Sequence, residues 1–514
     1  MPTTTTLALL VPLVIAAAAQ NVLEFGLQRG PVHQAVQRRS LQRRAAGTYV
    51  ETLVNNVTGG SYYASVSVGT PAQAQTVVVD TGSSDLWVVA SNADLCTNQK
   101  MQAEYGQHCV TTYDRSDSST YKLIEQGGFS ITYVDGTSSD GDFISDTFSI
   151  GGATIKALQM GYATKIVSGV GVMGIAFNSS ESTTQTYPNL LDQFVDQGLI
   201  TSKAFSLYLN DYRSDGGSLL FGGVDTDKFI GSLSVLPIVQ TTNSNSSYTI
   251  LAVSLGGMSA TGSSKGKATT IPFDSTLPAI LDSGTTLSYL PNSLAQDVFD
   301  AVGAYTDNET TGYTFVDCDA GASISLTFTF GSKTQVTVPA SQIVLDIFAG
   351  EEDQLPQNVP FSRACLFGIQ SMGESTDAGS GSESKSAFAS TSSYALLGDT
   401  FLRSAYVVYD LTNDEIAIAP ANLNSSTSTI VQMGTGTGIP TVTGVKSQQT
   451  TYTGSATKTA DSSGGAVTVT ASPTGTTHSK SAAVRARQDG GLGAIAVAGM
   501  ACLVSLVGGA FLAI

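Results

Sequence analysis

The sequence predicts an all-β protein built from two similar lobes. Short runs that alternate apolar and polar residues dominate its central part, for example residues 62–68, 129–134 and 323–330, and helical periodicity is scarce. A stretch of apolar residues running into Asp-Thr-Gly-Ser-Ser (77–84) returns about two hundred residues later as Asp-Ser-Gly-Thr-Thr (279–286). A body covering residues 45–423 is too long for one core. We therefore expect one lobe at 45–240 and a second at 241–423, flanking a cleft.

The two repeated stretches each place an aspartate directly after a buried strand. A carboxylate in that position is costly unless a partner or hydrogen bonds hold its charge. Peptide hydrolysis at acidic pH needs one group that activates water and another that donates a proton. Two carboxylates about 3 Å apart share one proton and can supply both groups. Asp80 and Asp282 are therefore the candidate catalytic pair. The alternative, two unrelated turns after buried strands, leaves the duplication unexplained.

These twin loops resemble those of the pepsin-like aspartic proteases, in which each lobe contributes one aspartate to a shared site. The resemblance extends to an entry strand ending in Gly-Thr-Pro (61–71) and to a second pair of apolar stretches at 171–176 and 395–400. It implies a bilobal pepsin-like fold with Asp80 and Asp282 as the catalytic pair. It also places Gly82, Ser83, Gly284 and Thr285 beside the substrate.

The same resemblance predicts a flap, a hairpin that closes over substrate. Its tyrosine follows the run Phe-Ser-Ile-Thr, which makes it Tyr133, with Asp135 as a neighbour on the substrate side. The family usually has glycine after this tyrosine, whereas this chain has Val134, and the change should stiffen the tip. Trp87, the only tryptophan, is expected behind the flap with its indole N–H bonded to a partner.

Composition disfavours other kinds of chemistry. Only three histidines occur, at 33, 108 and 478, and a Ser-His-Asp triad or a histidine-rich zinc site would rest on His108 alone. No phosphate-binding or dinucleotide-binding fingerprint appears in a fitting context. We expect no metal and no cofactor. The formal net charge of −17 argues against nucleic-acid binding.

The N-terminal region is typical of a secreted precursor. Residues 1–19 are an expected signal peptide, and residues 20–44 an expected pro-segment with five arginines and one acid. Two dibasic pairs, Arg38-Arg39 and Arg43-Arg44, indicate processing near residue 45. Removal of residues 1–44 changes the net charge from −17 to about −21. A basic segment on an acidic enzyme suggests a zymogen whose pro-segment is released as carboxylates take up protons.

Five cysteines are present, and an oxidising compartment favours their pairing. Four cysteines allow three connectivities. The lobe division and the fungal secreted relatives favour Cys96 with Cys109 and Cys318 with Cys365, which leaves Cys502 in the C-terminal tail. Candidate N-glycosylation sites, each an Asn-x-Ser/Thr sequon, are Asn56, Asn178, Asn245, Asn308 and Asn424.

The C-terminal region changes abruptly in composition. Residues 424–489 are rich in Ser, Thr and Gly, which indicates an O-glycosylated stalk or a merely flexible linker. Residues 490–514 are apolar and follow small and polar residues, the pattern of a GPI-anchor signal that is removed. Ser481 and Gly490 are candidate attachment sites. A transmembrane helix is the alternative, but no basic segment follows the tail.

The sequence thus predicts a monomeric aspartic endopeptidase that cleaves proteins at acidic pH on the outer face of the plasma membrane or in the cell wall. It resembles the yapsin and candidapepsin-type enzymes of fungal cell surfaces. One alternative is a catalytically silent pepsin fold that serves as a surface binding or adhesion protein. A wall-structural mannoprotein would explain the stalk but not the two aspartate loops. Preference for basic or for apolar residues at the cleavage site stays open.

Overall fold

A computed structural model describes residues 22–29 and 61–448, apart from 135, 184, 215, 241–247, 263–267, 274, 332, 350–354, 357 and 373–393. Strands dominate this part of the chain, which confirms the all-β, bilobal prediction. The signal peptide, the residues after 448, Cys502, Asn56 and Asn245 lie outside the described residues. Among the helices that are described, none is long and apolar enough to cross a bilayer.

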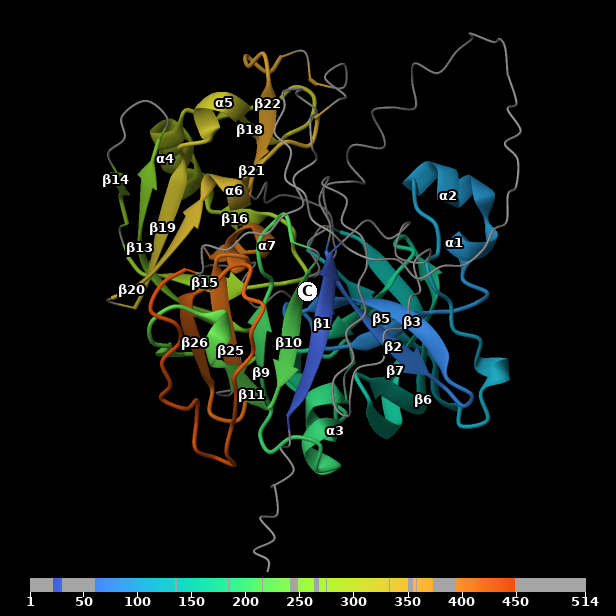
Figure 1. Ribbon diagram of the computed structural model, residues 1–514. Helices are drawn as coiled ribbons and strands as arrows, with labels where there is room; N and C mark the ends of the chain where they lie inside the picture. The colour runs from blue at the N-terminus through green and yellow to red at the C-terminus, as the bar shows by residue number, and fades with distance from the viewer. Residues whose placement is uncertain are drawn as a thin grey trace, which may run out of the picture.

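The largest sheet in the described residues has 13 strands in the order β12-β26-β25-β9-β10-β1-β2-β3-β8-β4-β7-β6-β5. In chain order its strands are β1 (Leu23–Arg29), β2 (Tyr62–Val68), β3 (Gln73–Asp80), β4 (Leu86–Val89), β5 (Lys122–Thr132), β6 (Ser138–Ile150), β7 (Ala153–Ile166), β8 (Gly171–Gly174), β9 (Ala204–Tyr208), β10 (Gly216–Phe221), β12 (Ser234–Pro237), β25 (Ala405–Asp410) and β26 (Glu415–Pro420). It forms the first lobe and continues beneath the second (Figure 1).

The second lobe is built on a sheet of eight strands: β13 (Ala252–Thr261), β14 (Ala268–Ile271), β15 (Leu277–Leu281), β16 (Ser288–Leu290), β19 (Ser325–Phe330), β20 (Thr334–Pro339), β23 (Ile369–Ser371) and β24 (Ala395–Leu397). A smaller sheet beside it contains β17 (Tyr305–Thr306), β18 (Thr314–Asp317), β21 (Val344–Leu345) and β22 (Ala364–Phe367). The helices are short: α1 (Asp94–Thr97), α2 (Gln99–Tyr105), α3 (Leu190–Asp196), α4 (Asn292–Val302), α5 (Cys318–Gly321), α6 (Ala340–Ile343) and α7 (Asp399–Leu402).

The repeat in the sequence appears as a repeat in topology. In the first lobe β3 runs parallel to β8, and β8 pairs antiparallel with β4. In the second lobe β15 runs parallel to β24, and β24 pairs antiparallel with β16. These strands are almost fully buried. Strands that are covered on both faces of a sheet have continuous apolar runs in their sequence, as these do. Each lobe therefore delivers an aspartate loop at the end of an equivalent strand.

The lobes share strands at their base. β25 and β26, from near the end of the second lobe, pair with each other, and β25 also pairs with β9 of the first lobe. The division at 240/241 expected from the sequence therefore does not separate the sheets. The shared sheet fixes one lobe relative to the other, and Figure 1 shows β25 and β26 beside β9 and β10.

Part of the expected pro-segment is a strand of this shared sheet. β1 lies between β10 and β2, with Leu27 buried. Glu24 on β1 is partly buried, and its burial, together with the charge of Asp225, raises its pKa, whereas Lys228 lowers it. A raised pKa means that the docked strand favours the protonated carboxyl, so at Glu24 acid strengthens the docking of β1 rather than releasing it.

The packed structure continues past the change in composition at residue 424. β27 (Ile430–Gln432) pairs with β11 (Gly223–Asp225). Met433 is buried against the face formed by β9, β25 and β26, and Val445 bonds to the backbone of Phe229. Residues 424–448 are therefore part of the folded body, and a stalk would begin beyond them.

Substitution Met433→Ala tests this extension. The change removes a fully buried side chain and leaves a cavity, so the free energy of unfolding should fall by about 2–5 kcal/mol. Urea unfolding of the variant measures the change, and Ser428→Ala, at an exposed position of the same segment, should leave it nearly unaltered. Equal stability of Met433→Ala and the parent would show that the extension does not pack.

Candidate active site

The two loop aspartates meet at the centre of the molecule. Asp80 is the last residue of β3, and Asp282 follows β15 directly. Both side chains are fully buried. A Cβ atom added to Gly82 would lie 2.6 Å from Asp282 Oδ1, so the backbone of one loop approaches the carboxylate of the other. Only glycine allows this approach, which explains the glycine in the first motif.

Each carboxyl is held in the same way by its own loop. Asp80 Oδ1 accepts a hydrogen bond from the Gly82 amide at 2.7 Å, and its Oδ2 accepts from the Ser83 hydroxyl. Asp282 Oδ1 accepts from the Gly284 amide at 2.8 Å, and its Oδ2 accepts from the Thr285 hydroxyl at 2.5 Å. Donors on both oxygens fix the plane of each carboxyl group.

The residue after each aspartate ties the two loops together. The Thr81 hydroxyl donates to the Leu281 carbonyl at 2.7 Å and accepts from the Ser283 amide at 2.9 Å. The Ser283 hydroxyl donates to the Val79 carbonyl at 2.8 Å and accepts from the Thr81 amide at 3.2 Å. These four bonds are reciprocal and buried, so the distance between the lobes is fixed at the site.

The electrostatics follow from this enclosure. Burial raises the pKa of both aspartates, because it penalises the charged form. The charge of Asp282 raises the pKa of Asp80 further, while the hydrogen bonds from Ser83 and Gly82 lower it. For Asp282 the bonds from Thr285 and Gly284 oppose the effect of burial. The two carboxyls also act on each other: the interaction raises the pKa of Asp80 and lowers the pKa of Asp282.

The second pair of apolar stretches supports the loops from behind. Ile175 N donates to the Asp80 carbonyl and Ala176 N to the Ser83 carbonyl, both at 2.9 Å. In the other lobe Asp399 N donates to the Thr285 carbonyl at 2.8 Å. A Cβ on Gly398 would lie 2.2 Å from that carbonyl oxygen, so the position requires glycine. Asp399 is fully buried in α7 and supports the loop through its backbone.

The predicted flap is the hairpin of β5 and β6. Tyr133 is 2% exposed, and its hydroxyl accepts a hydrogen bond from Trp87 Nε1 at 2.8 Å, which supplies the partner expected for the indole. Gly136 N donates to the Tyr133 carbonyl across the turn, and Gly136 has φ +81°, which favours glycine there. Val134 is 39% exposed at the tip. Asp135 lies outside the described residues.

The structure thus gathers Gly82, Ser83, Gly284 and Thr285 around the two carboxyls, and Tyr133 is bonded to Trp87 on β4, the strand that follows the first loop. One polar group nearby was not singled out from the sequence. The Thr286 hydroxyl is buried and has no hydrogen-bond partner within the described ranges, whereas the equivalent Ser84 hydroxyl donates to the Phe177 carbonyl at 2.6 Å. The sequence could have pointed to Thr286, because it stands one residue after Thr285 in the repeated motif.

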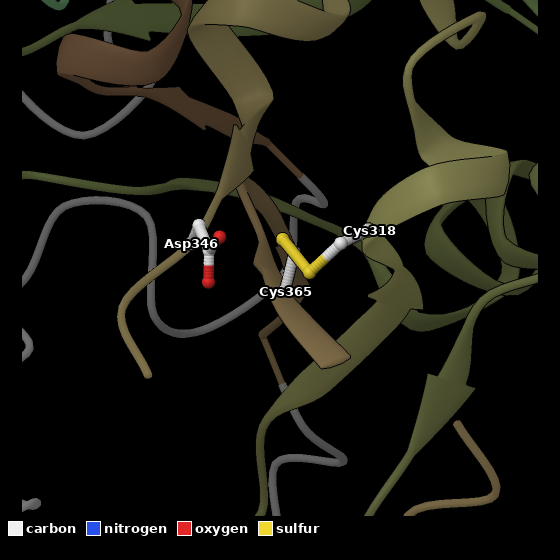
Figure 2. A group of neighbouring side chains, drawn as sticks. All are labelled: Cys318, Asp346 and Cys365. Carbon is white, nitrogen blue, oxygen red and sulfur yellow. A yellow bond between two sulfur atoms is a disulfide. The ribbon is translucent and has the colours of Figure 1, made fainter. Parts of the chain in front are cut away.

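A group of potential metal ligands lies away from this site. Cys318, Asp346 and Cys365 lie together in the second lobe (Figure 2). The two sulfur atoms form a disulfide, so neither offers a thiolate, and Asp346 accepts a hydrogen bond from Arg363. The group is therefore a covalent cross-link rather than a metal centre. The other expected pair, Cys96 and Cys109, also forms a disulfide.

Three of the five glycosylation candidates lie within the described residues. Asn308 is exposed in the turn that follows β17. Asn178 is half-buried, and its amide donates to Asp192 Oδ2 at 2.9 Å. Asn424 is half-buried with φ +59°. Of these, Asn308 is the side chain most accessible in the fold.

Comparison with known proteins gives a consistent result. Residues 61–421 match the sequence model of the family described as eukaryotic aspartyl protease. The chain is 40% identical over 427 residues to the probable aspartic-type endopeptidase opsB of Aspergillus fumigatus, covering 81% of this chain and 79% of the relative. It is 34% identical to candidapepsin of Candida tropicalis (79% and 89% covered) and 36% identical to secreted aspartic protease 8 of Candida albicans (74% and 80% covered).

Substitution Ser283→Ala tests the bonds between the loops. It removes the donor to Val79 and the acceptor of Thr81 N–H, and leaves both groups buried without that partner. The free energy of unfolding should fall by about 1–3 kcal/mol. Thermal or urea unfolding measures it, with Ser65→Ala at an exposed position of β2 as the control. An unchanged stability would show that these bonds do not hold the loops together.

Proposed function

Because the chain belongs to the eukaryotic aspartyl protease family, we propose that Asp80 and Asp282 are its catalytic pair and that they hydrolyse peptide bonds at acidic pH. The chain is an aspartic endopeptidase, a hydrolase acting on proteins. The single observation that supports the proposed pair is that the two carboxyls are enclosed together and held by matching hydrogen bonds. We propose that they share one proton, since burial and the charge of Asp282 raise the pKa of Asp80.

The shared proton gives the two carboxyls different roles. The ionised carboxyl accepts a proton from a water molecule bound between them, and that water attacks the scissile carbonyl carbon. The protonated carboxyl donates to the carbonyl oxygen, and a proton then passes to the leaving nitrogen. No covalent intermediate with the protein forms. The bonds from Gly82, Ser83, Gly284 and Thr285 keep both carboxyls oriented through the cycle.

The flap completes the site by covering the substrate. Tyr133 is fixed from behind by Trp87, so the hairpin presents a defined surface to an extended peptide. Asp135 and the other neighbouring residues of the flap tip contribute to this contact in our proposal.

The place of action is proposed from the two ends of the chain and from its relatives. An apolar segment at 1–19 and two disulfides support entry into the secretory pathway. The relative from Candida albicans carries "secreted" in its name. The apolar tail at 490–514 supports a GPI anchor, with residues 449–489 as the stalk and protein substrates met at the cell surface. We propose that the enzyme acts as a monomer.

A catalytically silent surface protein with this fold is the second candidate. Loss of an aspartate, of its glycine or of its hydroxyl partner would favour it. All of these groups are present and bonded in both loops, so the geometry favours catalysis.

Replacing either aspartate tests the catalytic pair. Asp80→Asn and Asp282→Asn each keep the side-chain shape but remove the shared proton, so kcat/KM for a peptide library at pH 3–5 should fall by at least about a thousandfold. Cleavage by the parent should be blocked by pepstatin. Asp297→Asn, at an exposed site on α4, should retain full activity. Cleavage by either active-site variant at the parent rate would contradict the proposal.

Cutting the chain after residue 489 tests the anchor. The truncated protein should appear in the medium, whereas the full chain should stay on cells and be released by a phospholipase specific for phosphatidylinositol. A full chain that resists the phospholipase but is extracted by detergent would indicate a transmembrane helix instead.

A further inference from the structure

A second pair of buried carboxyls lies directly behind the first catalytic loop. Asp85, five residues after Asp80, is fully buried, and Glu181 is 8% exposed. Three hydrogen bonds join the catalytic loop to the segment that leads to Glu181. Gly174 N donates to the Asp85 carbonyl at 3.0 Å, and Ala176 N to the Ser83 carbonyl at 2.9 Å. The Ser84 hydroxyl donates to the Phe177 carbonyl at 2.6 Å. Any change in that segment is therefore transmitted to the loop that carries Asp80.

The two carboxyls differ in their hydrogen bonds. Asp85 Oδ1 accepts from the Tyr187 hydroxyl and its Oδ2 from the Ser182 amide, both at 2.7 Å, so its two oxygens have donors, as an ionised group requires. Glu181 Oε2 accepts from the Tyr187 amide at 2.8 Å, but its buried Oε1 has no partner within the part of the chain that the structure describes. An ionised Glu181 would leave a charged oxygen unsolvated, and protonation removes that cost.

The charges that face Glu181 act in the same direction. Burial is the main cause that raises the pKa of Glu181 to about 8; the hydrogen bond from the Tyr187 amide opposes it, and the charges of Asp85 and Asp192 add smaller increases within that value. Lys203 forms a salt bridge to Asp192 at 3.2 Å. Burial also raises the pKa of Asp85, opposed by Tyr187 and Ser182. Tyr187 itself stays protonated as a donor, because its pKa lies well above the ordinary value.

We propose that Glu181 is a positioning residue that keeps residues 178–183 and 185–187 packed behind the catalytic loop only while its carboxyl is protonated, and so sets the upper pH limit of the enzyme. This inference rests on the proposed function but concerns a different carboxyl pair. A carboxyl whose folded pKa exceeds its unfolded value stabilises the fold fully below the unfolded value, near 4.5. That stabilisation is lost as the pH rises toward about 8, and the catalytic loop then loses its support.

Substitution Glu181→Gln tests the proposal, since the amide keeps the shape and cannot ionise. We expect the pH at which activity is lost during incubation to rise by about one unit or more, with the acidic side of the profile unchanged. Trp87 reports the same transition without any need for catalysis, because it is the only tryptophan and lies two residues from Asp85. Its emission should change at the same higher pH. Glu104→Gln, at an exposed position of α2, is the matched control and should leave the limit where it is.

A second variant predicts the opposite shift. Tyr187→Phe removes a hydrogen-bond donor from Asp85, and the pKa of Asp85 should then rise further. Asp85 would then need its proton, as Glu181 does, so the upper pH limit should fall. If Glu181→Gln prevents folding, Tyr187→Phe decides alone. An upper limit unchanged in Glu181→Gln, or unchanged in Tyr187→Phe, overturns the proposal. A Trp87 transition that shifts as expected in a protein without peptidase activity would uphold this inference and contradict the proposed function instead.

Discussion

Two carboxyl groups enclosed side by side cannot both carry a charge at ordinary cost, and this constraint explains much of the structure. Asp80 and Asp282 come from strands about two hundred residues apart, yet their loops must be held at hydrogen-bonding distance. The reciprocal bonds of Thr81 and Ser283 supply that restraint, and the glycines supply the space. Buried strands end at both loops, and bonds from Ile175, Ala176 and Asp399 support the loops from behind, so the surrounding sheets keep the two carboxyls in place.

The shared sheet supplies the remaining rigidity. β25 of the second lobe pairs with β9 of the first, so the lobes do not meet only at the active site. Residues 424–448 cover one face of that sheet, and β1 fills a position within it. The aspartate motifs give no sign of either segment. Both segments nevertheless pack on or within the sheet that carries the first aspartate loop. Burial raises the pKa of Glu24, so at this residue acid favours the docked form of β1.

What the sequence could predict was local or repeated. The two aspartate loops were visible as a repeat in the sequence, whereas the flap tyrosine and both cysteine pairs, Cys96 with Cys109 and Cys318 with Cys365, came from the resemblance to the pepsin-like proteases and the division into lobes. The role of β1 could not be predicted, since its partner β10 lies nearly two hundred residues away. The change in composition at residue 424 also did not mark the end of the folded body. The residues around Met433 are mostly Ser, Thr and Gly, and the few apolar side chains among them that are buried do not change the average composition. Asp85 and Glu181 lie close together only in the folded chain, where Tyr187 bonds to both, and no sequence motif marks them.

The central claim is that Asp80 and Asp282 share one proton, and a ¹³C NMR titration of the aspartate carboxyls tests it most directly. The spectra of the parent compared with those of Asp80→Asn and Asp282→Asn would assign the two carboxyl signals. We predict that one of the pair stays protonated well above the ordinary aspartate pKa of 3.8 while the other is ionised, and that removal of either aspartate alters the titration of the other. Two independent titrations near 3.8 would contradict the account.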